Sequence, residues 1–315
     1  MPSPPDQFKI HDAGSYNQVA PSFDFWTQRV TTPLAQRLVD LVALQPADRV
    51  LDVGAGSGVV TVAVAKQIAP PGMVVGIDLS EGMLEVARGN ARAAGLDERI
   101  QLRKMDAEHL EFEDGSFDAV VSLFALLHFP DPARALREMC RVVKPGGRVV
   151  VAIGSGPIFS RAGLSAIVSR LFEAWQLARG RVLVAPEFLD RLVQKHIPRE
   201  APHEHAHTPS HPPVQKSMGS LFRSADLQIA GTEWHRCSHQ LSSAEEFWEL
   251  QATFSSMARK RLALASADEV RHIRALFLAS CQRVLFAGGR LVYHNGALFV
   301  VGIRSREKPL PSTGK

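Results

Sequence analysis

Cysteine is scarce in this sequence, and the positions of the few cysteines exclude two kinds of stabilising site. The 315 residues contain three of them, Cys140, Cys237 and Cys281, which lie far apart. An odd number of distant cysteines argues against a disulfide framework, and none forms the close pair that is typical of a zinc site. We therefore expect a protein of the reducing cytoplasm.

Long apolar runs are absent as well. No stretch reaches the roughly 18 consecutive apolar residues that predict a membrane span, and residues 1–7 lack the basic-then-apolar order of a secretory signal. The remaining composition is ordinary for a globular protein, with 45% hydrophobic and 22% charged residues. A chain of this length can form one core of usual size with insertions.

The chain as a whole has no large excess of charge, but its two halves differ. Residues 1–150 carry a net charge of −4, and residues 151–315 carry a net charge of +8. A basic half can favour an anionic partner such as nucleic acid. Because the basic residues are scattered rather than run together, a solvated surface on added helices is the favoured interpretation.

Strands and helices alternate between residues 49 and 153. The expected strands are 49–53, 73–77, 100–104, 117–122 and 148–153, with helices at 59–67, 80–94 and 134–143. Such alternation predicts an α/β fold with a parallel, doubly wound sheet. The carboxyl ends of its strands then meet at one edge, where sheets of this kind bind ligands.

The first strand runs into a glycine-rich turn that contains Gly54, Gly56 and Gly58. Glycines let the backbone turn sharply and let a ligand approach it, and the following helix directs its N-terminal N–H groups at that ligand. Asp52, just before the turn, would repel a pyrophosphate but attract a ligand with an ammonium and a sulfonium group. S-adenosylmethionine is such a ligand.

Further candidate residues follow the later strands. Asp78 ends the second strand, where a doubly wound fold places a carboxylate that binds ribose hydroxyls. Asp106 follows the third strand and is expected to accept a hydrogen bond from an adenine amino group, with Ala107 beside it. Met83 is expected to pack on the purine, and residues 122–125 follow the fourth strand where the strand order should reverse.

Together these motifs resemble a class I S-adenosylmethionine-dependent methyltransferase. The resemblance covers about residues 16–153 and depends on the segments 52–58, 76–80, 105–107, 117–120 and 144–147. Residues 16–24 and 128–132 are similar to the small-molecule branch that includes quinone-biosynthesis C-methyltransferases. The resemblance implies S-adenosyl-L-methionine as cofactor, S-adenosyl-L-homocysteine as product, and a Rossmann-like seven-stranded sheet whose last strand is antiparallel.

The resemblance also implies roles for single residues, including a tyrosine at position 16 that helps to cover the cofactor. The residues expected to bind the cofactor are Tyr16, Asp52, Gly54, Ala55, Gly56, Asp78, Leu79, Met83, Asp106, Ala107, Ser122 and Leu123.

The alternation stops near residue 154, and the sequence predicts five parts. Residues 1–44 form a leader, flexible over 1–15, and a helix that covers the cofactor site; residues 45–155 form the core. Residues 156–226 form a helical lid, with an apolar helix at 158–178, and a His/Pro-rich loop. Residues 227–304 supply the last two strands with a helical insertion at about 243–288, and a hairpin of 291–293 with 296–303 is left open. Residues 305–315 form a polar tail.

Histidines offer two further chemical interpretations. His128 either deprotonates an acceptor hydroxyl or enol, since histidine exchanges protons near neutral pH, or holds the loop before the next helix. His235, His239 and Tyr293 are alternative bases, and the sequence does not choose among them. Histidines also recur between residues 196 and 211, but the prolines there favour a mobile loop, so no metal is predicted.

The predicted activity is methyl transfer to oxygen or carbon of a hydrophobic small molecule, such as a quinone, a polyketide or another secondary-metabolite-like acceptor. The alternative is a nucleic-acid-modifying methyltransferase that uses the basic second half. Residues 122–125 read Ser-Leu-Phe-Ala, whereas base N-methyltransferases of this fold usually carry Asn/Asp-Pro-Pro-Tyr/Phe there. No nucleic-acid partner is therefore expected, and a homodimer is left open.

Overall fold

The computed structural model describes residues 4–154, 175, 182–185, 187–201 and 214–306. Two compact units are present, and each is described by itself. Unit 1 comprises residues 1–154, 206–235 and 297–315, and unit 2 comprises residues 155–205 and 236–296. Two predicted segments lie outside the described residues. They are the apolar helix at 158–178, apart from residue 175, and residues 202–213 of the His/Pro-rich loop.

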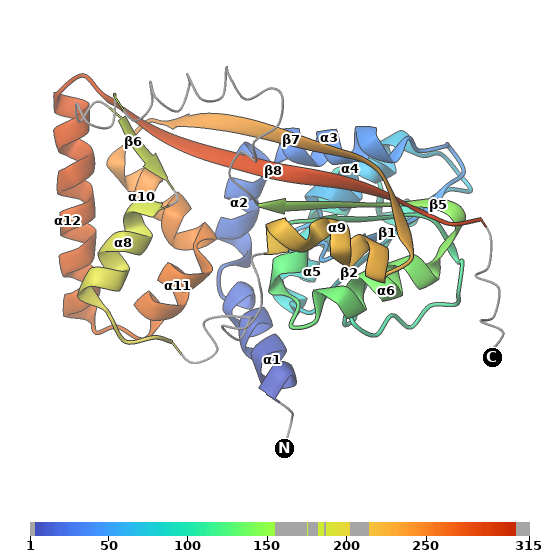
Figure 1. The fold of residues 1–315 in the computed structure, drawn as a ribbon. Coiled ribbons are helices and arrows are strands. Elements are labelled where there is room, and N and C mark those ends of the chain that lie inside the picture. Colours follow the sequence, from blue (N-terminus) through green and yellow to red (C-terminus); the bar gives the residue numbers. More distant parts are fainter. Residues whose placement is uncertain (1–3, 155–174, 176–181, 186, 202–213, 307–315) are drawn as a thin grey trace. The chain divides into compact units, whose positions relative to one another are not determined.

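A mixed sheet forms the centre of unit 1 (Figure 1). Its order is β3-β2-β1-β4-β5-β8, and β7 pairs with β8. Strands β1 to β5 are parallel, whereas residues 297–303 of β8 run antiparallel to residues 148–154 of β5. The expected doubly wound sheet with an antiparallel last strand is therefore confirmed. The bounds are β1 (Arg49–Val53), β2 (Met73–Asp78), β3 (Ile100–Lys104), β4 (Phe117–Leu123), β5 (Val143–Gly154), β7 (Leu227–Leu241) and β8 (Arg290–Arg304).

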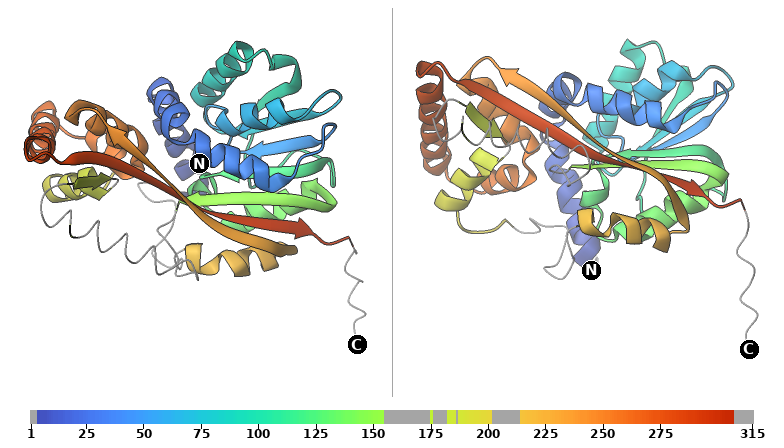
Figure 2. Two further views of the ribbon diagram at one scale, coloured as in Figure 1. Left: turned by 90° about the horizontal axis from the view of Figure 1, so that it is seen from above. Right: turned by 45° about the horizontal axis from the view of Figure 1, so that its top comes forward.

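Helices cover both faces of this sheet (Figure 2). One face carries α3 (Thr32–Val42), α4 (Val59–Gln67) and α5 (Glu81–Ala93), and the other carries α6 (Pro132–Val142) and α9 (Val214–Ser224). Because both faces are covered, β4 is buried at nearly every position rather than at alternate ones. The Asp131 side chain accepts a hydrogen bond from the backbone N–H of Arg134 and so caps α6. The Ser80 side chain accepts one from the N–H of Met83 and caps α5.

The N-terminal residues form two helices, α1 (Pro4–Asn17) and α2 (Ala20–Val30). The expectation of a flexible leader over residues 1–15 is therefore wrong for residues 4–15, and the single helix expected before residue 44 is in fact three. α1 is polar along most of its length, so its own sequence gave little sign of it. Its contacts with distant loops, described below, hold it in place.

The described part of unit 2 contains helices, one short strand and the adjoining ends of β7 and β8. β6 (Val182–Ala185), which was not expected, pairs in parallel with residues 290–293 of β8. The hairpin of residues 291–293 with 296–303, which the sequence left open, does not form, because residues 290–304 form one continuous strand. Phe277 lies in the aromatic core of the unit, with the rings of Phe188, Phe247 and Trp248 5.1–5.7 Å from its own. The helices are α8 (Glu187–His196), α10 (Ala244–Phe254), α11 (Ser256–Ala263) and α12 (Ala267–Phe286).

In the described part of the chain, no helix is both long and apolar enough to cross a membrane.

Candidate functional site

The glycine-rich turn between β1 and α4 has the conformation that only glycine adopts readily. Gly54, Gly56 and Gly58 have φ angles of 75°, 54° and 86°. A side chain on Gly54 would bring its Cβ within 2.2 Å of the Cβ of Ala125, so this glycine is also required for packing. A Cβ on Gly56 would meet nothing within 4 Å. The backbone at Gly56 is thus the point where a ligand can approach the turn.

Asp52 lies beneath this turn and is fully buried. Its Oδ2 accepts a hydrogen bond of 2.6 Å from the Thr61 hydroxyl, whereas its buried Oδ1 has no hydrogen-bond partner. Burial raises the pKa of this carboxyl to about 7, and the Thr61 hydrogen bond opposes that rise. A buried acceptor without a partner is costly, so this oxygen is suited to a donor that arrives with a ligand.

Asp78 connects the end of β2 to the glycine turn. Its Oδ2 accepts from the backbone N–H of Gly56, and its Oδ1 accepts from the N–H of Ser80, both at 2.9 Å. Burial raises its pKa, against the effect of these two hydrogen bonds. Each carboxylate oxygen retains a lone pair for a further donor. Leu79 follows directly and is half-buried.

Asp106 follows β3 and meets a lysine that the sequence analysis did not single out. Lys9 Nζ lies 2.7 Å from Asp106 Oδ2 and 2.7 Å from Glu108 Oε2. Burial opposes ionisation of Asp106, but hydrogen bonds from Lys9 and from the N–H of Glu108 outweigh it and hold the pKa below its usual value. Ala107, the next residue in the sequence, is buried. Met83, in the first turn of α5, is buried as well.

A hydrogen bond joins the end of β4 to the end of β1. The Ser122 hydroxyl donates to the carbonyl of Val53 at 2.8 Å, so this side chain serves the scaffold. Leu123 is buried, and Phe124, the next residue, has a φ angle of 62°. This left-handed residue turns the chain away from the sheet toward the short 3₁₀ segment Leu126–His128.

His128 contacts two side chains of α1. Its Nδ1 lies 3.2 Å from Asp12 Oδ2, and its Nε2 lies 3.4 Å from the Tyr16 hydroxyl. The rings of Tyr16 and His128 also meet edge to face, 5.6 Å apart, and Tyr16 contacts Phe23 in the same way. The structure therefore brings together two residues that the sequence predicted separately, and adds Asp12, which it did not predict.

Lys9 and Asp12, which the sequence analysis missed, belong to a helical spacing pattern that can be read from the sequence. Lys9, Asp12 and Tyr16 recur at spacings of three and four, which places them on one face of α1. The pattern is polar, so a search for apolar periodicity passes over it.

The rest of the N-terminal segment contacts two further loops. Asn17 Oδ1 accepts from the Ser80 hydroxyl at 2.7 Å and from the N–H of Gly82 at 2.9 Å. Asp24 accepts from Asn90, whose Nδ2 also donates to the carbonyl of Ser57 within the glycine turn. Each of the loops after β1, β2, β3 and β4 is thus connected to a residue between 9 and 24.

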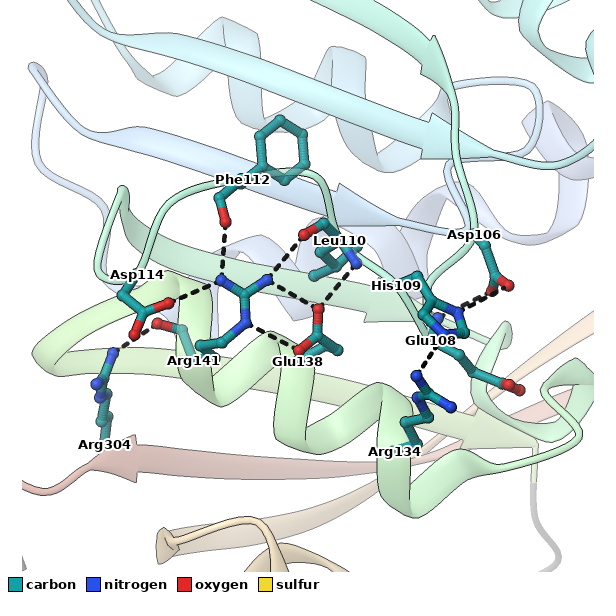
Figure 3. Close-up of polar contacts among 10 residues, drawn as sticks. All are labelled: Asp106, Glu108, His109, Leu110, Phe112, Asp114, Arg134, Glu138, Arg141 and Arg304. Carbon is teal, nitrogen blue, oxygen red and sulfur yellow. Dashed lines mark hydrogen bonds and ion pairs between the residues drawn. The ribbon is translucent and has the colours of Figure 1, made fainter.

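An arginine beneath the site supports the loop after β3 (Figure 3). Arg141 on α6 pairs with Glu138 and Asp114 and donates to the carbonyls of Leu110 and Phe112, each at 2.8 Å. These hydrogen bonds hold the pKa of the guanidinium above and that of Glu138 below the usual value. The network fixes residues 110–114, and it contains none of the residues that the sequence analysis expects to bind the cofactor.

The alternative bases have different surroundings. Tyr293, in unit 2, is buried against Phe254, and burial raises its pKa. His235 is half-exposed and lies 3.9 Å from Glu233. Among the described residues, no three metal-ligating side chains lie together, and His196 belongs to α8 rather than to a loop. The other histidines of the predicted loop, His203, His205, His207 and His211, lie outside the described residues.

The cofactor-site segment matches a known family. Residues 51–151 match the family model described as a methyltransferase domain. Demethylmenaquinone methyltransferase from Lactobacillus johnsonii is 34% identical over 152 residues, which cover 47% of this chain and 62% of that protein. A methyltransferase from Amycolatopsis mediterranei that is named for 27-O-demethylrifamycin SV is 38% identical over 177 residues, 55% of this chain and 60% of that protein. The chain spans less than two thirds of the length of these curated relatives.

A solved structure shares the fold. The YcgJ protein from Bacillus subtilis aligns with 87% of this chain and 98% of its own, with a TM-score of 0.53 and 20% sequence identity.

Proposed function

We propose that this chain, whose residues 51–151 form a methyltransferase domain of the class I S-adenosylmethionine-dependent family, methylates oxygen or carbon of a hydrophobic small molecule. The named acceptors of two relatives, demethylmenaquinone and 27-O-demethylrifamycin SV, support this acceptor class. The nucleic-acid alternative is not favoured by these relatives.

The observation that carries the proposal is the buried Oδ1 of Asp52, which has no hydrogen-bond partner under a glycine turn open at Gly56. An ammonium group of the bound cofactor would satisfy this oxygen. Asp78 would accept hydrogen bonds from the ribose hydroxyls. Asp106 would accept a hydrogen bond from the adenine amino group, either together with the one from Lys9 or after the Lys9 side chain has moved away. The residues therefore fit S-adenosyl-L-methionine from its amino-acid end to its base.

Bound in this way, the cofactor would supply a methyl group on a positively charged sulfur. The chain's own residues then have to align an acceptor atom with that carbon, exclude water and receive any proton that the acceptor loses. Alignment of two reactants is worth on the order of 7–11 kcal/mol in favourable cases.

The test compares two ligands that share adenosine and a thioether but differ in the amino-acid group. S-adenosyl-L-homocysteine carries the ammonium group, and 5′-methylthioadenosine does not. We expect Asp52→Asn to lower the affinity for S-adenosyl-L-homocysteine roughly 10- to 100-fold, which is about 1.4–2.7 kcal/mol, and to leave 5′-methylthioadenosine unaffected. Asp78→Asn should weaken both ligands, because both contain the ribose.

Isothermal titration calorimetry measures both affinities. Asp48→Asn is the matched control, since Asp48 precedes the opposite end of β1, where it accepts from the N–H of Gln45. Wild-type protein that binds neither ligand, or an Asp52→Asn effect of equal size on both, contradicts the proposed site.

We also propose a cytoplasmic location and no nucleic-acid partner, and we test the chain for a homodimer. Gel shifts with RNA at two salt concentrations test the second point, because binding through phosphate contacts weakens steeply with salt. Size-exclusion chromatography with light scattering tests the third.

A further inference from the structure

Lys9 of α1 pairs with two carboxylates in the loop after β3, and one of them is Asp106, the residue proposed to bind the adenine amino group. We propose that Lys9 is a positioning residue that sets the base specificity of the cofactor site. It keeps Asp106 in the form that only accepts hydrogen bonds, and this form selects a 6-amino purine over a 6-oxo purine. The inference rests on the proposed function and adds to it a residue that the sequence analysis did not single out.

Backbone N–H groups fix both carboxylates on the side away from Lys9. Asp106 Oδ1 accepts from the N–H of Glu108 at 2.9 Å, and Glu108 Oε1 accepts from the N–H of Asp131 at 2.9 Å. The other two oxygens, Asp106 Oδ2 and Glu108 Oε2, each lie 2.7 Å from Lys9 Nζ. The two carboxylates are thus held close together, with the ammonium group of Lys9 between them.

Burial makes this balance of charge important. The side chains of Lys9 and Glu108 are 11% and 6% exposed, so solvent screens their charges little. Burial opposes the charge on Lys9, but hydrogen bonds with the two carboxylates outweigh it and raise the pKa of the ammonium group. Burial also opposes ionisation of Asp106, and Lys9 makes the largest contribution that lowers its pKa. Without Lys9, burial and the repulsion between like charges would both favour a protonated carboxyl.

Two further groups face Asp106 from the side of α6 (Figure 3). His109 Nδ1 lies 3.5 Å from Asp106 Oδ2, and the Arg134 side chain contacts Nε2 of the same ring. Because an arginine only donates hydrogen bonds, Nε2 is the acceptor and Nδ1 carries the proton. His109 is therefore a neutral donor, and a neutral ring does not supply the charge that Lys9 supplies.

One lone pair of Asp106 remains for a base while Lys9 stays in place. Oδ2 faces Lys9 and His109, whereas in the described part of the chain Oδ1 meets only the N–H of Glu108. An ionised carboxylate cannot donate, so this lone pair fits the amino group at position 6 of adenine. The oxygen at position 6 of hypoxanthine is itself an acceptor and would meet that lone pair with no proton between them. A protonated carboxyl can donate to this oxygen, so the charge on Asp106 decides which base fits.

The experiment compares S-adenosyl-L-homocysteine with S-inosyl-L-homocysteine, in which the 6-oxo base hypoxanthine replaces adenine. Calorimetry at pH 7 gives the ratio of the two affinities for each variant. We expect the wild type to prefer the adenine ligand roughly 100-fold or more, and Lys9→Met to reduce that preference about tenfold or more. The two bases also differ at N1, but that difference is the same in every variant, so the change in the ratio isolates the effect of Lys9.

Two further variants separate base selection from anchoring of α1. Lys9→Arg keeps the positive charge and should keep the preference for adenine. Asn17→Ala removes contacts between α1 and the loop after β2 but leaves Lys9 in place, so it should weaken both ligands by the same factor. The preference of Lys9→Met should be smaller at pH 6 than at pH 8, because low pH favours the protonated carboxyl, while the wild-type ratio stays constant.

Carbon-13 spectra of the side-chain carboxyl groups test the same effect of charge without a ligand. The signals of Asp106 and Glu108 are identified by their loss in Asp106→Asn and Glu108→Gln. We expect one of the two groups to take up a proton at a higher pH in Lys9→Met than in the wild type.

The outcomes distinguish this inference from the proposed function. An equal affinity ratio in the wild type and Lys9→Met, or a proton uptake that Lys9→Met leaves unchanged, overturns the role of Lys9 and leaves the proposed cofactor in place. Weaker binding of the 6-oxo ligand alone in Lys9→Met would mean that Lys9 donates to the base directly, which also overturns the inference. Wild-type protein that binds neither ligand overturns the proposed function and the base selection together.

Discussion

Asp52 should make the stability of the protein depend on pH in a direction unusual for an aspartate. Burial raises its pKa from the usual 3.8 to about 7, so the folded state binds a proton more tightly than the unfolded state does. The stabilising contribution is complete below about pH 4 and is lost as the pH rises through 7. A shift of about 3 pKa units corresponds to about 4 kcal/mol in all, of which about 2.5 kcal/mol falls between pH 5 and pH 8. Because the side chain is fully buried, solvent screening reduces this figure little.

The assay is urea denaturation of wild type and Asp52→Asn across that range. The difference between the two unfolding free energies isolates Asp52 from the other titrating groups, and we expect it to change by about 2.5 kcal/mol in favour of the variant as the pH rises. Thr61→Val removes the hydrogen bond that opposes the rise in pKa, so it should shift the transition to higher pH, while Thr61→Ser should not. A difference curve that is flat, or that slopes the other way, refutes the reasoning.

Three shorter predictions concern the scaffold of the site. Gly54→Ala should lower the unfolding free energy, measured by urea denaturation, by about 3 kcal/mol or more, because the new Cβ clashes with Ala125 and the backbone φ is left-handed. Gly56→Ala has the same backbone strain but open space around the new Cβ, so it should cost only about 1–2 kcal/mol. Arg141→Lys should cost about 2–3 kcal/mol in the same assay, since a lysine cannot replace the fork that pairs with Glu138 while also serving two carbonyls. Lys9→Met leaves two carboxylates facing each other, so amide hydrogen exchange in α1 should accelerate roughly 10- to 100-fold at neutral pH and less below about pH 4.

The sheet could be predicted because its signals are local, and the residues proposed to bind the cofactor lie at positions that the same signals mark. Strands β1, β2 and β4 are short and largely apolar, and Asp52, Asp78 and Asp106 each stand at or within two residues of the end of a strand. In a parallel sheet the strand ends meet at one edge, so position along the chain is enough to bring these residues together. The left-handed conformation of Gly54 likewise follows from the turn that it has to make.

The contacts of α1 could not be predicted in this way. Lys9 pairs with Asp106 and Glu108, which are 97 and 99 positions further along the chain. Asp12 contacts His128, which is 116 positions further along. The helix buries little apolar surface, so it lacks the periodicity that reveals α3, and polar contacts with residues far along the chain hold it. The continuous strand β8 was missed for a similar reason, since residues 290–293 pair with β6, a partner that the sequence did not indicate.

The distribution of these polar contacts has a consequence for the chemistry. The segment that supplies Asp12 and Tyr16 also contacts the loops after β2 and β3, and its Asp24 is connected to the loop after β1 through Asn90. These loops hold the residues proposed to bind the cofactor. If the cofactor binds as proposed, its adenine amino group meets an Asp106 side chain that already pairs with Lys9, so binding would change this contact. The contacts of Asp12 and Tyr16 with His128 likewise depend on the position of α1. We therefore expect binding of the proposed cofactor and the arrangement around His128 to change together.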